Sequence, residues 1–302
     1  MTDDAPIAYM ERTRAYYLAL GYANPYRWAH FTDVPFVRLA KPLSAARVAI
    51  ITTAAPHRPD LGDQGPGAPY NASAKFYAVY SLPISGPIDL RISHVTYDRT
   101  HTTADDPATW LPLAALKEAA ASGRIGEVAP RLHGLPTNRS VATTIDVDAP
   151  DLVARCRADG VDAAALVPNC PVCHQSCSIA ARALEAAGIA TVVMGCARDI
   201  VEHCGVPRFL FSDFPLGNAC GRPHDRASQR DTLRLALDLL EQATAPRTTV
   251  RSPLRWTASG TDWKRDYLAI DHLAPDEIAR RRAENDRARD AAKSVRSADM
   301  AR

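Results

Sequence analysis

From residue 151 onward, the sequence alternates short apolar runs with longer amphipathic stretches. Each apolar run has the length of a buried strand, and each amphipathic stretch repeats its apolar residues every three or four positions, as helices do. The predicted order is a helix over 152–158, a strand over 161–167, a helix over 176–187, a strand over 190–195, a helix over 197–204, a strand over 208–212 and a helix over 229–243. Such alternation predicts an α/β fold with a doubly wound, mostly parallel sheet and helices on both faces.

The first half of the chain carries weaker signs of the same architecture. Residues 47–53 form a continuous β-branched apolar run, as expected of a strand that is buried on both faces. Further predicted elements are a loop over 54–72, a strand over 90–95 and a helix over 111–122. A break near 134–150 leaves open whether the α/β region, residues 46–245, forms one domain or two lobes.

Two segments flank the α/β region. Residues 1–45 are predicted to be a helical arm, with one helix over 7–20. We expect its aromatic rings to pack the arm onto the body or to line a substrate pocket: Tyr16, Tyr17, Tyr22, Tyr26, Trp28 and Phe31. Residues 246–302 form a C-terminal extension, in which the charged stretch 276–290 is predicted to be a solvated helix. We expect about the last ten residues to be disordered.

Composition limits the kind of partner. The 302 residues carry a net charge of +2, with 46% apolar and 23% charged residues, which gives no reason to expect nucleic acid or a membrane as partner. No segment approaches the roughly 20 apolar residues that a membrane helix needs. The first residues lack the basic and apolar regions of a signal peptide, and no dinucleotide or nucleotide phosphate motif follows a strand. We expect a cytoplasmic homo-oligomer without a bound cofactor.

Three of the seven cysteines lie within eight residues, in the run Val-Pro-Asn-Cys-Pro-Val-Cys-His-Gln-Ser-Cys that ends at Cys177. Cys170 ends a predicted strand, and Cys173 and Cys177 lie where a helix begins. The positive end of a helix dipole favours a thiolate over a thiol. Ligands of open parallel sheets bind beyond the carboxyl ends of the strands. In a reducing compartment, such a Cys-x-x-Cys indicates redox or metal chemistry before it indicates a structural staple.

These cysteines have three open interpretations. In redox catalysis, Cys170 attacks an electrophile, Cys173 resolves the product as a disulfide, and Cys177 is a backup thiol or tunes the other two. A zinc or iron–sulfur site would use the same cysteines with His174, although no second Cys-x-x-Cys completes a four-ligand set. In the third interpretation they are buried and inert.

Polar side chains follow the other predicted strands, and this repeated position favours a shared site. We predict His57 and His94 as catalytic proton donors. The predicted substrate-binding residues are Arg58, Asp98, His101, Asn169, His174, Asp213 and Asn218. His101 is a third candidate proton donor, and Cys196 is expected to face the same crevice. Each of these residues could instead cap a helix or hold a turn.

Several segments resemble the selenoprotein B family of the glycine, sarcosine, betaine and D-proline reductases. They are residues 89–98, 123–126, 155–162, 167–173, 183–189 and 213–218. The resemblance runs from about residue 45 to about residue 245.

The resemblance implies a reductive chemistry. Members of that family cleave a carbon–nitrogen bond with a selenocysteine in a Sec-x-x-Cys motif, and dithiols supply the electrons. The resemblance places Cys170 at the selenocysteine position and Cys173 at the position of its partner. A thiolate is a weaker nucleophile and a poorer leaving group than a selenolate, which implies slower chemistry or a more activated substrate. The pyruvoyl group of some relatives lies on a separate subunit, and this sequence shows no sign of carrying one.

We therefore expect a thiol-dependent reductase that cleaves a carbon–nitrogen or carbon–sulfur bond of a small polar metabolite. An external thiol or a thioredoxin-like protein would reduce the resulting disulfide. A metal protein that uses the same cysteines and a non-catalytic redox subunit remain the alternatives.

Overall fold

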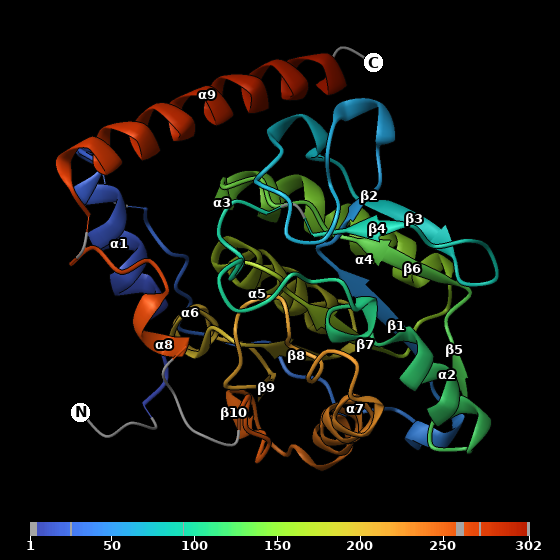
Figure 1. The fold of residues 1–302 in the computed structure, drawn as a ribbon. Helices are drawn as coiled ribbons and strands as arrows, with labels where there is room; N and C mark the ends of the chain where they lie inside the picture. The colour runs from blue at the N-terminus through green and yellow to red at the C-terminus, as the bar shows by residue number, and fades with distance from the viewer. Residues whose placement is uncertain (1–4, 25, 93, 258–262, 272, 301–302) are drawn as a thin grey trace.

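A single mixed sheet of eight strands forms the centre of the molecule (Figure 1). The structure is a computed structural model that describes residues 5–24, 26–92, 94–257, 263–271 and 273–300. The strands of the sheet are β1 (Arg47–Thr52), β3 (Tyr80–Pro83), β5 (Glu127–Val128), β6 (Arg131–Gly134), β7 (Ala163–Val167), β8 (Ala190–Gly195), β9 (Arg208–Phe211) and β10 (Thr248–Arg251). Their spatial order is β10-β9-β8-β7-β1-β6-β3, with β5 paired to β1. All neighbours are parallel except β3, which runs antiparallel to β6.

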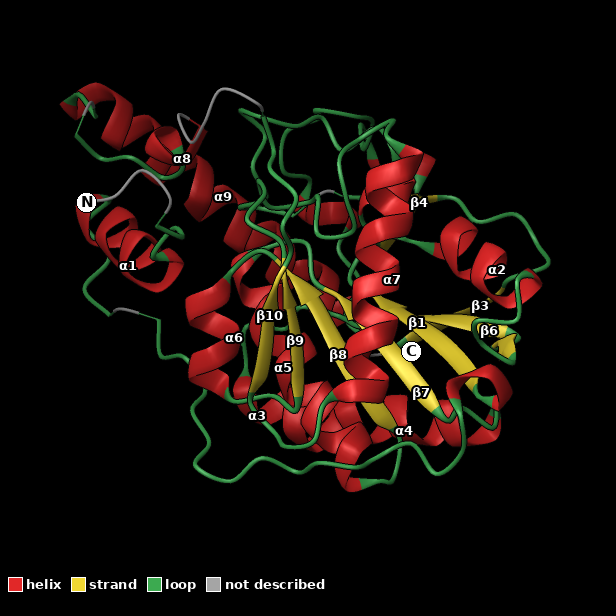
Figure 2. Ribbon diagram, turned by 90° about the horizontal axis from the view of Figure 1, so that it is seen from below, coloured by secondary structure: helices red, strands yellow, loops and turns green. Residues whose placement is uncertain are grey.

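Alternate residues of the central strands face two separate hydrophobic cores, because successive side chains of a strand point to opposite faces. The helices that cover the sheet are α2 (Leu113–Ala121), α4 (Ala149–Ala158), α5 (Pro171–Ala186), α6 (Arg198–Cys204) and α7 (Arg226–Gln242). Ile50 and Ala165 pack in the core shared with α2 and α7, whereas Ile51 and Leu166 pack in the core shared with α4 and α5. Figure 2 shows α7 lying across one face of the strands. The predicted doubly wound α/β fold is confirmed.

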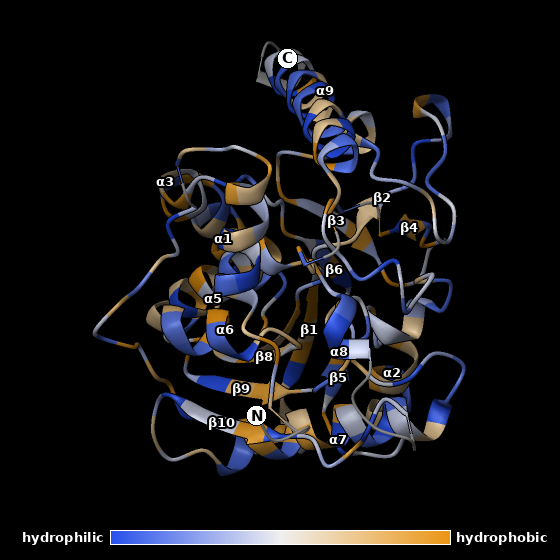
Figure 3. Cartoon of the chain, turned by 60° about the vertical axis from the view of Figure 1, so that its left-hand side comes forward, coloured by the Kyte–Doolittle hydropathy of each residue, from blue (hydrophilic) through white to orange (hydrophobic). Residues whose placement is uncertain are grey.

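The helical arm and the C-terminal extension meet at the edge of this body. The arm contains α1 (Tyr9–Ala19), and the extension contains α8 (Trp263–Asp266) and α9 (Pro275–Met300), which spans the top of the molecule in Figure 1. The Tyr22 hydroxyl donates to Asp286 of α9 over 2.8 Å. Figure 3 shows that α9 is mostly hydrophilic. It continues to Met300, where the sequence predicts disorder, and 301–302 lie outside the described residues.

Helices and strands whose apolar pattern lies within one segment occur where they are predicted. Strand β8, for example, has the predicted bounds. Helix α5 begins at Pro171, five residues before the predicted helix. The strand predicted over 90–95 is wrong in extent: among the described residues of this span, only Leu90–Arg91 (β4) forms a strand, and residue 93 lies outside the described residues. Strand β4 pairs with β2 (Ala55–Pro56) outside the main sheet. Strands β3, β6 and β10 are not predicted at all. Short helical turns complete the chain: η1 (Leu43–Ala45), η2 (Pro59–Leu61), η3 (Ala72–Ala74) and η4 (Pro107–Thr109).

The sheet is continuous across the break considered near 134–150. Helix α3 (Val141–Thr143) and the π-helical turn η5 (Thr144–Asp148) lead from β6 to α4 and so to β7. Both β6 and β7 pair with β1, one on each side. From β7 the chain winds on to β8, β9 and β10, away from the β6 side. The boundary between β1 and β7 is therefore the switch point of the sheet, where α/β proteins form their crevice.

Thr53 and Asn169 tie the two strand ends together at this switch point. The backbone N–H of Asn169 and its side-chain amide both donate to the Thr53 hydroxyl, each over 3.1 Å. Cys170 follows directly. Among the described residues, no helix combines the length and the hydrophobicity of a bilayer-spanning segment.

Candidate active site at the cysteine turn

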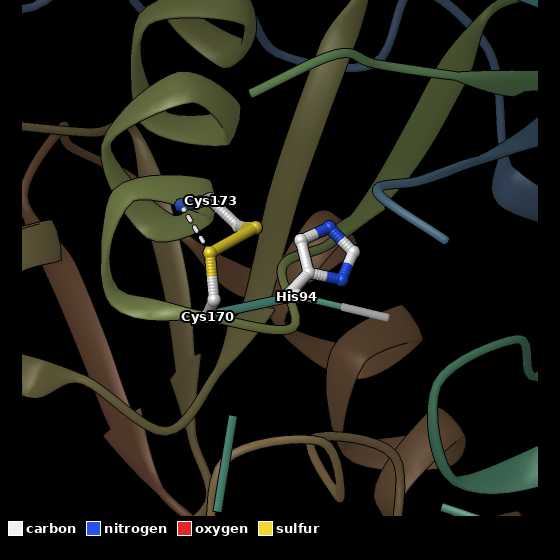
Figure 4. Close-up of side chains that lie close together, drawn as sticks. All are labelled: His94, Cys170 and Cys173. Atoms are coloured by element: carbon white, nitrogen blue, oxygen red, sulfur yellow. Dashed lines mark hydrogen bonds between the residues drawn. A yellow bond between two sulfur atoms is a disulfide. The ribbon is translucent and has the colours of Figure 1, made fainter. Parts of the chain in front are cut away.

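Cys170 caps the N-terminus of α5, and Cys173 lies in the first turn of that helix (Figure 4). Their sulfurs are joined in a disulfide, with Cα atoms 4.9 Å apart. The backbone N–H of Cys173 donates to the Cys170 sulfur over 3.2 Å. Pro171 suits the first helical position because it has no N–H to leave unpaired. After reduction, the aimed N–H and the helix dipole both favour a thiolate on Cys170.

The ring of His94 lies beside the sulfur pair, on the loop after β4 (Figure 4). One ligand atom each of His94, Cys170 and Cys173 lies within 4.8 Å of the others. The Nδ1 atom of His94 is buried and has no hydrogen-bond partner among the described residues. Burial lowers the pKa of His94 to about 3, and the charges of Lys75 and Arg99 act in the same direction. The imidazole is therefore neutral at pH 7, with one nitrogen available to a group bound beside the sulfurs.

Thr137 and Lys75 complete the surroundings of the pair, and sequence reasoning missed both. The Thr137 hydroxyl lies 3.2 Å from the Cys173 sulfur. Burial, together with the nearby charges of Arg139 and Arg296, lowers the pKa of Lys75 to about 7. No motif marks these residues, because they come from segments that meet the cysteine turn only after folding. Neither residue carries a sequence signal, because the strands nearest to them in the chain, β3 and β6, are themselves not predicted.

The two cysteines are more deeply buried than we would expect of thiols that attack a substrate. Cys170 is 3% exposed and Cys173 is fully buried. Cys170 nevertheless lines a cavity of about 40 Å³, together with polar groups that include His94, Lys75 and Thr137. A volume of this size is about that of one water molecule. The cavity borders a cleft of about 620 Å³, to which Lys75 also belongs.

His174 and Asn169 hold the turn rather than line the cavity. The Nδ1 atom of His174 donates to the Cys170 carbonyl over 2.8 Å, and Nε2 accepts the N–H groups of Cys196 at 2.9 Å and Ala197 at 3.1 Å. Burial lowers the pKa of His174 to about 4, which fits this neutral arrangement. The ring therefore joins the turns that follow β7 and β8, and Cys196 touches it through its backbone.

Cys177 points into the hydrophobic core between α5 and the sheet. It is fully buried among side chains that include Ala180 and Leu184, and burial raises its pKa strongly. The metal set considered from sequence, which combines Cys177 and His174 with the pair, is not assembled in the described structure. His94 stands in the third position instead.

The other predicted site residues lie elsewhere, each held by partners of its own. His57 and Arg58 lie directly after β2. His57 pairs with Asp89 at 2.8 Å, and Arg58 pairs with Asp60 at 3.2 Å. None of the residues in this group lines the cavity or the cleft: His57, Arg58, Asp98, His101, Asp213 and Asn218. The structure therefore does not bring them to the cysteine pair.

Four of these residues form ion pairs or hydrogen bonds in the C-terminal extension or in the loops beside it. His101 lies 3.0 Å from Asp98 and 3.6 Å from Asp266. Asp213 accepts from Lys264 at 2.6 Å and also pairs with Arg251. Asn218 is buried and donates to the carbonyl of Pro215 over 3.2 Å. These contacts fasten the C-terminal extension and the loop after β9.

Fold and site together define an α/β protein with a disulfide-linked cysteine pair at the switch point of its sheet. Over 143 residues, or 47% of this chain, the sequence is 27% identical to the D-proline reductase subunit gamma of Acetoanaerobium sticklandii. The match spans 59% of the length of that relative. No protein-family model matches the chain, and no solved structure is significantly similar to it. The similarity supports a distant relationship to the proline and glycine reductases.

Proposed function

We propose that the chain is a thiol-dependent reductase that cleaves a carbon–nitrogen or carbon–sulfur bond of a small polar metabolite. The observation that carries this proposal is the disulfide pair Cys170–Cys173 at the N-terminus of α5, beside His94 and a polar cavity. The similarity to a D-proline reductase subunit supports an oxidoreductase at the coarse level. Cytoplasmic location, homo-oligomerisation and an external thiol or thioredoxin-like reductant remain predictions from the sequence.

The proposed reaction transfers two electrons from the thiols to the substrate. The Cys170 thiolate attacks the substrate carbon, a carbon–sulfur bond forms, and the nitrogen or sulfur group leaves with the bonding pair and takes a proton. The Cys173 thiolate then attacks the Cys170 sulfur. The disulfide forms, and the carbon leaves with its electron pair and takes a second proton. Since that carbon carries negative charge as it leaves, the reaction requires a carbonyl or carboxyl group next to it.

The neighbouring groups have distinct proposed roles. The Thr137 hydroxyl, 3.2 Å from the Cys173 sulfur, stabilises the resolving thiolate. The free Nδ1 of neutral His94 lies in the same enclosure and accepts a hydrogen bond from the Cys170 thiol or from the bound substrate. With a pKa of about 3, this imidazole is too weak a base to hold the thiol proton, so water takes that proton and supplies the proton for the leaving group.

Trapping the covalent intermediate tests the proposal. Reduced protein is incubated with fractionated metabolite extracts, and the 170–177 peptide is examined by mass spectrometry. We expect Cys173→Ser to accumulate an adduct on Cys170, since the resolving thiol is missing, and Cys170→Ser to form none. Cys177→Ser is the matched control in the same helix and should behave as wild type. An undiminished turnover by Cys170→Ser would end the assignment. A reversible disulfide with no adduct and no turnover would instead favour a non-catalytic redox subunit.

A metal site is a second candidate, favoured by the closeness of three ligand atoms. His94, Cys170 and Cys173 would supply one imidazole nitrogen and two thiolates within 4.8 Å, and three protein ligands with an open position are typical of catalytic zinc. Reduced protein would be dialysed against zinc and analysed for metal. About one equivalent in wild type, lost in both His94→Gln and Cys173→Ser, supports the metal centre. Absence of bound zinc in the fully reduced protein supports the reductase.

A further inference from the structure

The cleft beside the cysteine turn is larger than an amino acid requires. Its volume is about 620 Å³, within the range of sites that enclose drug-sized molecules. It shares Lys75, Arg139 and Val172 with the small cavity at Cys170. A molecule in the cleft therefore lies next to the sulfur pair.

Among the described residues, all charged side chains that line this cleft are positive. Its lining contains no carboxylate among the described residues and includes five cationic side chains: Lys75, Arg139, Arg289, Lys293 and Arg296. Within the described chain, Lys75, Arg139 and Arg296 form no ion pair. Burial and the charges of Arg139 and Arg296 all lower the pKa of Lys75, so both arginines lie close enough to repel it. Lys75 is half-buried, whereas Arg139 and Arg296 are exposed. Unpaired charges of one sign around a cleft attract a ligand of opposite charge.

Two structural features hold this charge in place. Arg139 adopts a φ of 54°, a left-handed conformation that is uncommon for a residue with a side chain. Helix α9 supplies three of the five cations, although its hydrophilic surface gives it little reason to pack (Figure 3). Hydrogen bonds fasten it instead, from the Tyr77 hydroxyl to the Ala292 carbonyl over 2.8 Å and from Arg282 to the Leu20 carbonyl over 2.9 Å.

Five tyrosines also line the cleft. They come from the N-terminal arm and from the loop before β3: Tyr17, Tyr22, Tyr26, Tyr70 and Tyr77. Burial raises the pKa of Tyr17, Tyr26 and Tyr70. These phenols stay neutral at pH 7, so they add flat apolar surface and hydroxyl donors without adding negative charge.

We propose that the cleft binds a small unsaturated or aromatic anion with at least two negative charges, which Lys75, Arg139 and Arg296 hold. The tyrosines contact its flat part, and its reactive bond reaches Cys170 through the small cavity. Only this last statement rests on the proposed reductase function. Binding itself needs no thiol chemistry and can be measured on the oxidised protein.

Four probes of similar size test the charge preference by calorimetry on oxidised wild-type protein. Phthalate is an aromatic dicarboxylate, phenyl phosphate an aromatic phosphate, benzoate a monoanion and benzylamine a cation. We expect at least one dianion to bind about tenfold more tightly than benzoate, because one added charge gains about that factor near several cations. Benzylamine should not bind. Tighter binding of phthalate identifies carboxylates as the ligand groups, and tighter binding of phenyl phosphate identifies phosphate. Equal affinity for benzoate and both dianions overturns the proposal.

Variants that replace one cationic side chain by a neutral one test whether the preference for dianions arises in this cleft. Arg139→Gln and Arg296→Gln should each weaken binding of the preferred dianion about fivefold or more and benzoate by less. Arg226→Gln, at an exposed position at the start of α7, is the matched control and should change neither. A dianion preference that survives both variants places the site elsewhere and overturns the assignment. The two proposals can fail separately. If the protein shows no preference for dianions but still forms the Cys170 adduct, only the anion-binding proposal is wrong. If it prefers dianions but forms no adduct, only the reductase proposal is wrong.

Discussion

The Thr137 hydroxyl lies 3.2 Å from the sulfur of Cys173. Thr137 follows β6, and Cys173 lies in the first turn of α5, which follows β7. These strands flank β1 on opposite sides, so the contact spans the switch point of the sheet. A residue from the side of the sheet that contains β6 and the antiparallel strand β3 therefore contacts the cysteine pair.

Thr137→Val removes this hydroxyl while keeping the shape of the side chain. We expect the disulfide to become about tenfold harder to reduce, because a hydrogen bond to a charged acceptor is worth about 1.5 kcal/mol or more and stabilises only the reduced form. Equilibration with glutathione mixtures measures the change. Thr248→Val on the edge strand β10 serves as control. A redox equilibrium equal to that of wild type would show that the hydroxyl does not act on the thiolate.

Buried His174 makes the stability of the protein dependent on pH. Burial lowers its pKa from the ordinary 6.5 to about 4 in the folded protein. The unfolded chain therefore binds a proton between these values that the folded chain does not. The resulting stability is complete above pH 6.5 and is lost as the pH falls towards 4, by about 3 kcal/mol in all. Urea unfolding at pH 7, 5.5 and 4 measures this loss.

A His174→Gln variant separates this contribution from that of other acid-sensitive groups. We expect it to be less stable at pH 7 by about 2 kcal/mol, since two backbone N–H groups lose their acceptor. Its further loss on acidification should be smaller than that of wild type. His57→Gln, on a surface loop, should follow the wild-type curve. Parallel curves for His174→Gln and wild type would contradict the assignment.

Lys75 should react with amine reagents near neutral pH. With a pKa of about 7, about half of its amines are unprotonated at pH 7 and therefore nucleophilic. Trace labelling with acetic anhydride between pH 6 and 10, followed by peptide mapping, measures the midpoint. Exposed Lys117 on α2 provides the internal reference. A bound dianion should shift the Lys75 midpoint upward, because an opposite charge favours the ammonium. A midpoint near 10 without ligand would refute the predicted environment.

Glu185 and Arg208 form a buried ion pair that connects α5 with β9. Their charged groups lie 2.8 Å apart, and both side chains are fully buried. Arg208→Met leaves Glu185 buried without its partner and should destabilise the protein by about 3–5 kcal/mol. The double variant with Glu185→Met should recover part of that loss, because no uncompensated charge remains. Urea unfolding of the single and double variants measures both effects. A double variant as unstable as the sum of the single ones would exclude coupling.

Local patterns were sufficient for the central part of the fold. Strand β8 and the helices around it follow from apolar runs and helical spacing within each segment, because burial on both faces of a parallel sheet leaves a continuous apolar signature. Strands β3 and β6 lack such runs. Each has four residues, and the pairing of β6 with β1 and with β3 makes it a strand, which is a relationship between distant segments.

The same distinction applies to the candidate site. The sequence by itself determined the Cys170–Cys173 pair at a helix N-terminus, because their spacing and the helix start are both local, and it singled out His94. Only the tertiary structure decided that Thr137, Lys75 and Arg139 lie beside the pair and that α9 lines the neighbouring cleft, while His57, Arg58 and Cys177 lie apart from the pair. The physical reason is that strand order and loop packing set these distances, and both depend on contacts between residues far apart in the chain.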